Sequence, residues 1–167
     1  GLNLTDKRWL FFESNAPMTA VYEGEEAPNG ESIAAAGYDA NNGVVYALEN
    51  SGKLYRYSGI NPQSGKLTGR TQVATVAGAD SINEMAFNNA DGQLYAISGA
   101  ANLMTVDVNT GAVTEIGQFG SGVVAMDFDS NGTLWIVDLY GALCSVNLNT
   151  GAITQVAETG ISALAGQ

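Results

Sequence analysis

The sequence predicts an all-β fold of the β-propeller class, with three complete four-stranded blades and a partial blade assembled from the two ends of the chain. Two observations support this prediction. First, three segments with similar sequences recur at residues 37–48, 86–97 and 127–137. A turn of the type Gln-Ser-Gly or Asn-Thr-Gly follows each copy, at residues 63–65, 109–111 and 149–151. A repeat of roughly 40 to 45 residues with four short strands is typical of propeller blades.

Each copy of the repeated line holds an aromatic residue at the same place, namely Tyr46, Tyr95 and Trp135. Helical periodicity is absent, and apolar residues either alternate with polar ones or form short runs between turn residues. Glycine, with 21 occurrences, is frequent in the chain and supplies the positive φ that tight turns need. We therefore expect the three aromatic residues to occupy equivalent core positions.

The blade at residues 82–117 divides most clearly into strands, which we expect at 82–87, 93–98, 103–108 and 112–117. The following blade, at residues 123–157, repeats the pattern with strands at 123–128, 133–138, 142–148 and 152–157. The preceding blade, at residues 33–76, is looser, with strands at 33–38, 44–48, 53–57 and 67–76. Its longer connection, from residue 58 to residue 66, contains Pro62.

The two ends of the chain supply less than one further blade. Residues 8–22 are expected to form a partial blade with a third and a fourth strand, and residues 161–165 a closing first strand. No segment has the pattern of the second strand. An open stack would leave an apolar sheet face and unpaired edges bare. Three arrangements stay open: one composite blade from both termini, a homodimer that completes the ring, or membership of a larger propeller. The missing strand favours the last two.

The composition indicates a single domain over residues 1–167 with an acidic surface. The chain is 46% hydrophobic, which is enough for one core, and its net charge is −11. Such a charge disfavours nucleic acids and anionic membranes as partners and attracts basic proteins and cations. Acidity also serves simply to keep a β-rich protein soluble.

The chain has no histidine and one cysteine, Cys144. Without histidine, the chain lacks the commonest general base and metal ligand. Cys144 lies in a strand pattern and is expected to be a small buried residue without a disulfide partner. No apolar run reaches the roughly 18 residues of a membrane span, so membrane insertion is not expected. The start at Gly1 indicates a trimmed sequence. Few Lys and Cys with abundant Gly, Asn, Thr and Ser favour an extracellular, cell-surface or periplasmic bacterial protein.

Residues 32–159 resemble the extracellular bacterial propeller repeats of the NHL and YncE-like kind. The shared pattern is an aromatic residue beside Asp or Asn, a Gly turn, Leu-Tyr or Leu-Trp, and later Val-x-x-Asn-Thr-Gly. The resemblance implies a propeller that acts as a scaffold, a ligand binder or, in a few members, an enzyme. Lyases and hydrolases among related propellers commonly use His or several metal-binding carboxylates near the central channel, and this chain lacks His.

One segment has the pattern of a calcium loop. Asp127, Asp129 and Asn131 alternate ahead of a Gly turn, and Asp138 falls at the twelfth position. However, strands flank this segment and Trp135 stands where some calcium hairpins carry an acid. Side-chain capping of an ordinary turn explains the pattern equally well. The sequence therefore predicts no cofactor, and calcium at Asp127, Asp129 and Asn131 is the alternative that stays open.

The connections after each second strand and between blades are expected to share one face of the propeller, where ligands bind. The polar residues placed there form the predicted ligand face: Asp80, Asn83, Glu84, Ser98, Asn102, Ser121, Asp138 and Tyr140. Glu84 and Asp138 provide two carboxyls for acid–base chemistry, but no spacing in the sequence requires it, and loop polarity alone predicts the same residues.

The aromatic residues Trp9, Phe11 and Phe12 are the expected interface, because they lie in the partial blade that needs a partner. From all of this we predict a non-enzymatic, secreted or cell-surface propeller module for protein or glycan binding or for scaffolding. The alternative is a carboxylate-based hydrolase or lyase, with or without calcium. No residue is assigned a catalytic role.

Overall fold

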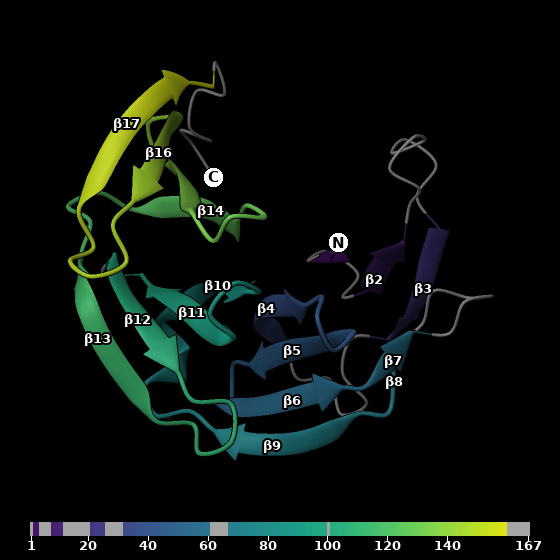
Figure 1. Cartoon of the computed structure of the whole chain (residues 1–167). Helices are drawn as coiled ribbons and strands as arrows, with labels where there is room; N and C mark the ends of the chain where they lie inside the picture. The colour runs from purple at the N-terminus through teal and green to yellow at the C-terminus, as the bar shows by residue number, and fades with distance from the viewer. Residues whose placement is uncertain are drawn as a thin grey trace.

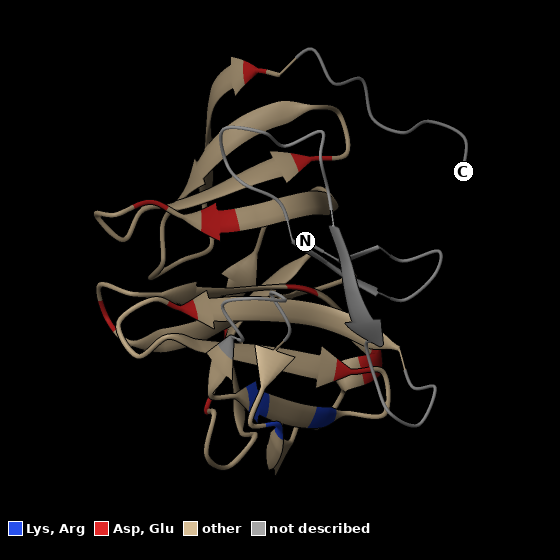
Figure 2. Cartoon of the chain, turned by 90° about the vertical axis from the view of Figure 1, so that its right-hand side faces the viewer, with Lys and Arg blue, Asp and Glu red and all other residues tan. Residues whose placement is uncertain are grey.

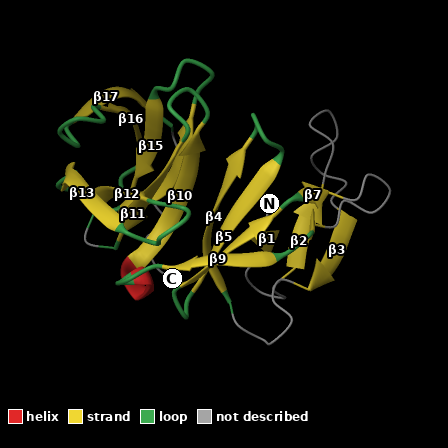
Figure 3. Cartoon of the chain, turned by 60° about the horizontal axis from the view of Figure 1, so that its bottom comes forward, coloured by secondary structure: helices red, strands yellow, loops and turns green. Residues whose placement is uncertain are grey.

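The computed structural model describes residues 32–60, 67–99 and 101–159, together with the backbone of three short N-terminal strands. Strands and turns make up these residues, apart from one 3-10 helical turn at Ala79–Ser81 (Figure 3). Within this part of the chain no helix has the length and apolarity needed to cross a membrane.

Three antiparallel four-stranded sheets form the body of the molecule (Figure 1). Blade 1 contains β4 (Ile33–Asp39), β5 (Val44–Glu49), β6 (Lys53–Tyr57) and β9 (Thr71–Thr75). Blade 2 contains β10 (Ile82–Asn88), β11 (Gln93–Ser98), β12 (Asn102–Val106) and β13 (Val113–Gln118). Blade 3 contains β14 (Val123–Phe128), β15 (Leu134–Asp138), β16 (Ala142–Val146) and β17 (Ile153–Glu158). The predicted all-β propeller fold is thereby confirmed.

Blade 1 departs from the prediction in its long connection. The expected fourth strand at 67–76 is divided into β8 (Leu67–Thr68) and β9, and β8 pairs with β7 (Gly59–Ile60) instead of with β6. The division falls at Gly69, whose φ of 67° turns the chain. A small hairpin therefore extends blade 1 at its outer end.

The N-terminal sheet has the order β1 (Leu2–Asn3), β2 (Arg8–Phe11) and β3 (Val21–Glu25). β1 pairs with β2 through Leu2 and Trp9, in the place of the second strand that sequence analysis did not find. Two residues are too short a segment to show an alternating pattern, which explains the omission. Phe12 and the expected closing strand at 161–165 lie outside the described residues.

The blades follow one another around an arc, and the inner strands β4, β10 and β14 stand next to each other on its concave side (Figure 1). The N-terminal sheet lies beyond blade 1, on the side away from blade 2. In the described part of the chain the arc remains open between this sheet and blade 3.

Side chains of a single strand serve two different cores. In β11, Leu94 and Ala96 pack into the core between blades 1 and 2, whereas Tyr95 and Ile97 pack into the core between blades 2 and 3. This follows from the alternation of side chains along a strand. It explains why β11 is apolar on both faces, and each fully buried Leu or Ile contributes about 1.5–3 kcal/mol.

The repeated aromatic residues hold equivalent places. Tyr46 stacks on Phe87 of the next blade at 5.8 Å between ring centroids, and Tyr95 meets Phe128 of the next blade at 5.1 Å. Trp135 has the same register in blade 3 but is only half-buried. The difference arises because the described residues provide no further blade to cover it.

Candidate ligand-binding site

The second strand of each blade ends at an equivalent position, just before the turn into the third strand. The residues at this position are Glu49, Ser98 and Asp138. All three are buried. Asp138 accepts hydrogen bonds from the backbone N–H groups of Tyr140 and Ala142, both at 2.9 Å. Ser98 accepts a longer one, 3.4 Å, from the N–H of Asn102. The side chains of Ser98 and Asp138 therefore stabilise the turns into the third strands.

The same turns require a left-handed residue three positions later. That residue is Gly52 in blade 1 and Gly141 in blade 3, with φ of 86° and 83°. In blade 2 it is Ala101, with φ of 62°, which is the one non-glycine residue with positive φ in the described part of the chain.

The predicted ligand face divides into residues that stabilise turns and residues that remain accessible. Ser98 and Asp138 are used in turns, and Ser121 donates to Asp138 at 3.4 Å. The exposed members are Asp80, Asn83 and Tyr140, of which the Tyr140 side chain is 78% exposed. Asn102 is half-buried.

Glu84 is the exception on this face. It is half-buried on the inner strand β10, next to the bulge at its start, and no partner for its carboxyl exists among the described residues. Burial raises the pKa of Glu84 to about 7. Its register equivalents in blades 1 and 3 are Ala35 and Ala125. Glu84 is thus a solitary carboxyl that exchanges a proton near neutral pH.

The predicted calcium residues lie in the turn between β14 and β15. One oxygen of Asp129 accepts from the N–H groups of Asn131 and Thr133, both at 2.9 Å, and the other accepts from Trp135 Nε1 at 3.1 Å. These bonds, the one from Thr133 first, lower the pKa of Asp129. Asp127 accepts from the N–H of Phe128 at 2.8 Å. Within the described residues no three His, Cys, Asp or Glu side chains gather as a metal site. Calcium stays a prediction, and Asp129 already has a role in the turn.

Sequence reasoning missed a groove of about 410 Å³ across the three inner strands. It is lined by Ala36, Gly37, Tyr38, Met85, Ala86, Phe87, Asn89, Met126, Asp127 and Phe128. β4, β10 and β14 contribute three equivalent residues each, because the blades repeat in register. The repeated line of sequence contained this information, since residues 37–38, 86–87 and 127–128 align in it. We call this surface the inner-strand groove.

The inner-strand groove can hold a small ligand or a side chain of a larger one, given that ligand sites commonly enclose about 300–1,000 Å³. Tyr38, 50% exposed, and Asp127 are its exposed polar groups. Met126 and Phe128 are half-buried and supply apolar contact area.

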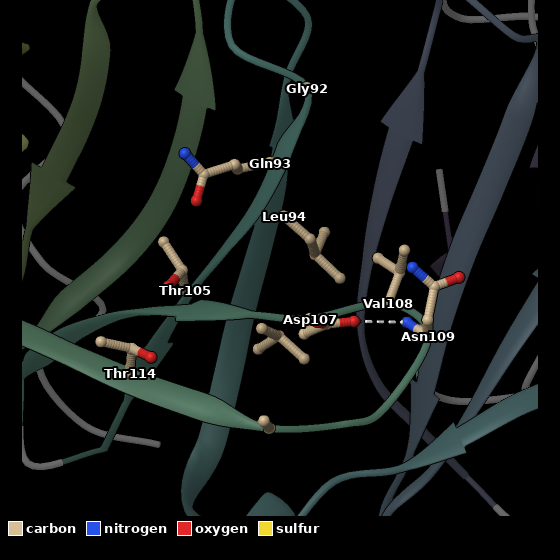
Figure 4. Close-up of a pocket in the computed structure, with 10 residues that line it drawn as sticks. Gly92, Gln93, Leu94, Thr105, Asp107, Val108, Asn109 and Thr114 are labelled. Atoms are coloured by element: carbon tan, nitrogen blue, oxygen red, sulfur yellow. Dashed lines mark hydrogen bonds between the residues drawn. The ribbon is translucent and has the colours of Figure 1, made fainter.

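A second hollow, of about 390 Å³, lies at the end of blade 2 (Figure 4). Gln93, Thr105 and Thr114 lie on one side of the blade there, and Leu94 and Val108 on the other. Asp107 accepts from the N–H of Asn109 at 2.8 Å, so it serves the turn. The side chains that line this hollow belong to both faces of one sheet. The hollow therefore lies around the end of the blade, and its lining does not form one continuous binding surface.

A charged cluster in blade 1 also escaped prediction. The Arg70 guanidinium lies 3.5 Å above the centre of the Tyr55 ring and donates to the buried carboxylate of Glu49. Among the described residues, Arg70 Nε is buried and has no hydrogen-bond partner. Blades 2 and 3 have Met104 and Cys144 in the place of Tyr55. The cluster lies on the face of blade 1 away from blade 2, so it distinguishes this face from the other joints.

Charge is distributed unevenly along the chain. Every Lys and Arg precedes residue 71, and Figure 2 shows blue segments on blade 1 alone among the described residues. Blades 2 and 3 therefore hold carboxylates without a basic residue of their own, which leaves their surface attractive to cations.

The chain is a β-propeller protein, because its four-stranded antiparallel sheets pack face to face around an arc with their first strands innermost. A family model described as a domain of unknown function (DUF4394) matches residues 60–134. No curated protein matches the chain.

Several solved structures share the fold. A protein of unknown function from Bacteroides thetaiotaomicron is similar with a TM-score of 0.63 and 13% identity, over 86% of this chain and 43% of that one. A chain of a nidogen/laminin complex has a TM-score of 0.63 and 13% identity, over 92% and 59%. A gluconolactonase from Xanthomonas campestris has a TM-score of 0.51 and 11% identity, over 74% and 46%. The chain thus spans about half the length of these proteins, and the likeness concerns the fold alone.

Proposed function

We propose that this chain is a non-enzymatic, secreted or cell-surface propeller module that binds a protein or a glycan, or holds partners as a scaffold. The supporting observation is the inner-strand groove, which is built from three equivalent inner strands and has Asp127 as its one carboxylate among the described lining residues. On the predicted ligand face, Asp138 accepts hydrogen bonds within its own turn, and Ser121 donates to Asp138. Binding in such a groove needs shape and apolar contact but no acid–base pair.

The test is binding by the full chain to a panel of immobilised oligosaccharides and of basic and acidic proteins. We expect one class to bind, and Tyr38→Ala or Tyr140→Ala to weaken it by tenfold or more, because exposed aromatic residues dominate binding energy at such surfaces. Val113→Ala, on the outer strand of blade 2, is the matched control and leaves affinity unchanged. Absence of binding to every member of the panel contradicts the proposal.

A carboxylate-based hydrolase or lyase is the second candidate, and one observation favours it. Glu84 has a raised pKa of about 7, which suits a general acid or base at neutral pH. A turnover of any ester, lactone or glycoside that Glu84→Gln abolishes would replace the binding proposal. Its rate should then depend on pH with a midpoint near 7.

A further inference from the structure

The turn between the second and third strands is built in the same way in blades 1 and 3. In blade 1, Gly52 has a φ of 86° and donates its N–H to the carbonyl of Glu49 at 2.8 Å. In blade 3, Gly141 has a φ of 83° and donates its N–H to the carbonyl of Asp138 at 3.0 Å. The two residues before each glycine therefore occupy equivalent positions, and their side chains can be compared directly.

These two positions are polar in blade 1 and apolar in blade 3. Blade 1 has Asn50 and Ser51, which are both exposed although blade 2 packs against blade 1. Blade 3 has Leu139 and Tyr140, which are 47% and 78% exposed. Because Asn50 and Ser51 stay exposed beside a neighbouring blade, the exposure of Leu139 and Tyr140 belongs to their place in the turn and does not depend on the open end of the arc.

The bulge at the start of the inner strand shows the same change from polar to apolar. In β10 the residue in the bulge is the exposed Asn83, and in β14 it is Val124, which is 40% exposed. The corresponding residue of β4 is the half-buried Ala34. Blade 3 thus has a larger apolar side chain at a position that the fold does not bury.

The apolar residues of blade 3 gather at one place. Leu139 donates its N–H to the carbonyl of Gly122 at 3.0 Å, and a Cβ on Gly122 would lie 2.5 Å from Cδ1 of Leu139. The Leu139 side chain therefore lies over Gly122, two residues before Val124 in the chain, and Tyr140 follows Leu139 in the turn. We call this surface the blade-3 patch: Gly122, Val124, Leu139 and Tyr140.

Hydrogen bonds hold the turn that presents the blade-3 patch. The Asp138 carboxylate accepts from the N–H groups of Tyr140 and Ala142, both at 2.9 Å. Thr159 donates its N–H and its hydroxyl to the carbonyl of Gly141, at 2.9 and 2.8 Å. A surface that is already held in one conformation loses less entropy when a partner binds. The patch is therefore a preformed binding surface.

The charge beside the blade-3 patch is negative. Glu158 is exposed on β17, where it pairs in register with Ala142, the first residue after the turn, and accepts a hydrogen bond from Gln155. No Lys or Arg occurs after residue 70 of the sequence, so neither blade 2 nor blade 3 has a basic residue of its own. A partner that combines an apolar side chain with basic neighbours therefore complements both the patch and its charge.

We propose that the blade-3 patch is a protein-docking surface whose partner is a peptide segment with an apolar or aromatic side chain flanked by Lys or Arg. That side chain packs against Leu139, Tyr140 and Val124, and its basic neighbours lie near Glu158. The inference rests on the proposed binding function and deepens it, because it names a basic protein segment as the partner. The contact is separate from the inner-strand groove, which reaches β14 at the other end of the strand, around Asp127.

The test begins with a displayed library of random short peptides and the immobilised full chain. We expect the chain to enrich peptides in which Leu, Phe or Trp is flanked by Lys or Arg. The consensus peptide is then synthesised with a fluorescent label, and its affinity is measured by anisotropy at several salt concentrations. Affinity should fall as salt is added, because screening weakens the attraction between opposite charges.

The decisive variant gives blade 3 the turn residues of blade 1, as Leu139→Asn combined with Tyr140→Ser. Blade 1 accepts these residues in the same turn, so we expect the fold to persist, which far-ultraviolet dichroism and the melting temperature verify. The affinity should fall by about tenfold or more, because a few central side chains dominate such interfaces. Val113→Ala, at a residue of similar exposure on β13, is the matched control and should bind as the parent does. Glu158→Gln should weaken binding by about two- to fivefold and reduce its salt dependence.

The inference is overturned if no peptide is enriched, if the enriched peptides lack basic residues, or if the turn variant binds as tightly as the parent. Partners from the oligosaccharide and protein panel that lose affinity with Tyr38→Ala but not with the turn variant would leave the proposed function standing and reject the blade-3 patch. Absence of every peptide, protein and glycan ligand contradicts both. Binding of the parent to phosphatidylcholine vesicles that the turn variant loses would assign the patch to a lipid surface and reject a protein partner.

Discussion

Glu84 stands at a register position where the neighbouring blades have alanine, and burial there raises the pKa of its carboxyl to about 7. No charge or hydrogen-bond donor among the described residues opposes the effect of burial on this carboxyl. The pKa is raised because the ionised form loses hydration without gaining a partner.

Glu84 is predicted to make stability depend on pH. Its pKa in the folded chain, about 7, exceeds the unfolded value of 4.5, so the folded state holds the proton more tightly. Stability is therefore highest below pH 4.5 with respect to this group and falls as the pH rises towards 7. Urea unfolding at a series of pH values should show this fall for the parent chain.

Glu84→Gln is the control for the pH effect, since the amide has the same shape but does not titrate. We expect its unfolding free energy to lose this fall between pH 4.5 and 7. Parallel curves for the two chains would show that the carboxyl of Glu84 is hydrated in the folded state.

Glu49 and Arg70 form an ion pair in blade 1, and this pair is predicted to contribute to stability. Removal of one partner leaves a buried charge behind, so Glu49→Gln or Arg70→Met should each lower the unfolding free energy by about 2–3 kcal/mol. The double variant should recover part of this loss, with a coupling energy of about 0.5–3 kcal/mol. Denaturant unfolding of the four chains measures the coupling, and strict additivity would contradict a direct interaction.

Individual residues were the least predictable part of the molecule. Arg70 follows a connection with no repeat pattern, and its contact with Tyr55 and Glu49 joins positions far apart in sequence. Asp138 was predicted as a ligand-face residue, yet it stabilises its own turn. Composition identifies polar loop residues, but it cannot distinguish a side chain that serves the backbone from one that serves a ligand.

The joint between blades depends on contact between a turn and a strand. Gly117 of β13 lies against the backbone of Thr150 and Gly151. A methyl group at Gly117 would have to displace this backbone, because it would meet the carbonyl oxygen at 2.1 Å and the carbonyl carbon at 2.8 Å. The close approach fixes how blade 3 sits on blade 2.

Gly117→Ala is therefore predicted to lower the unfolding free energy by about 1–3 kcal/mol. Gly99→Ala is the matched control: its new methyl group would have its nearest neighbour at 3.8 Å, so we expect a change within about 0.5 kcal/mol. Thermal or urea unfolding compares the two. Equal unfolding free energies for the two variants would mean that the backbone at the joint can move aside for the methyl group without loss of stability.

Strands were predicted well where the repeat is regular and poorly where it is not. In blade 3 the expected strands 123–128 and 152–157 correspond to β14 and β17 at Val123–Phe128 and Ile153–Glu158. In blade 1, Gly69 ends the pairing that the apolar pattern predicted for 67–76. Alternation reports a half-buried strand, but a two-residue strand such as β1 has no period to detect.

At the scale of the whole chain, all basic residues fall within the first 70 positions of the sequence. All Lys and Arg precede residue 71 and the net charge is −11, so carboxylates in blades 2 and 3 repel one another without internal compensation.

Added sodium chloride is therefore predicted to raise the melting temperature, because screening reduces the repulsion between carboxylates. Glu115→Lys, on an exposed part of β13, should raise the melting temperature at low salt and reduce the gain from added salt. Scanning calorimetry at several salt concentrations measures both effects. A melting temperature that falls with salt would show that attractive pairs outweigh the repulsion.

The turn of each blade that rests on a small residue of its neighbour has an evolutionary consequence. Because every joint uses the same parts, a duplicated unit brings its own connector and needs no newly invented contact surface. A gene that gains or loses one such unit can alter the size of the ring in a single step. Residues of the inner strands can then change in one blade at a time, while the contacts between blades stay unchanged.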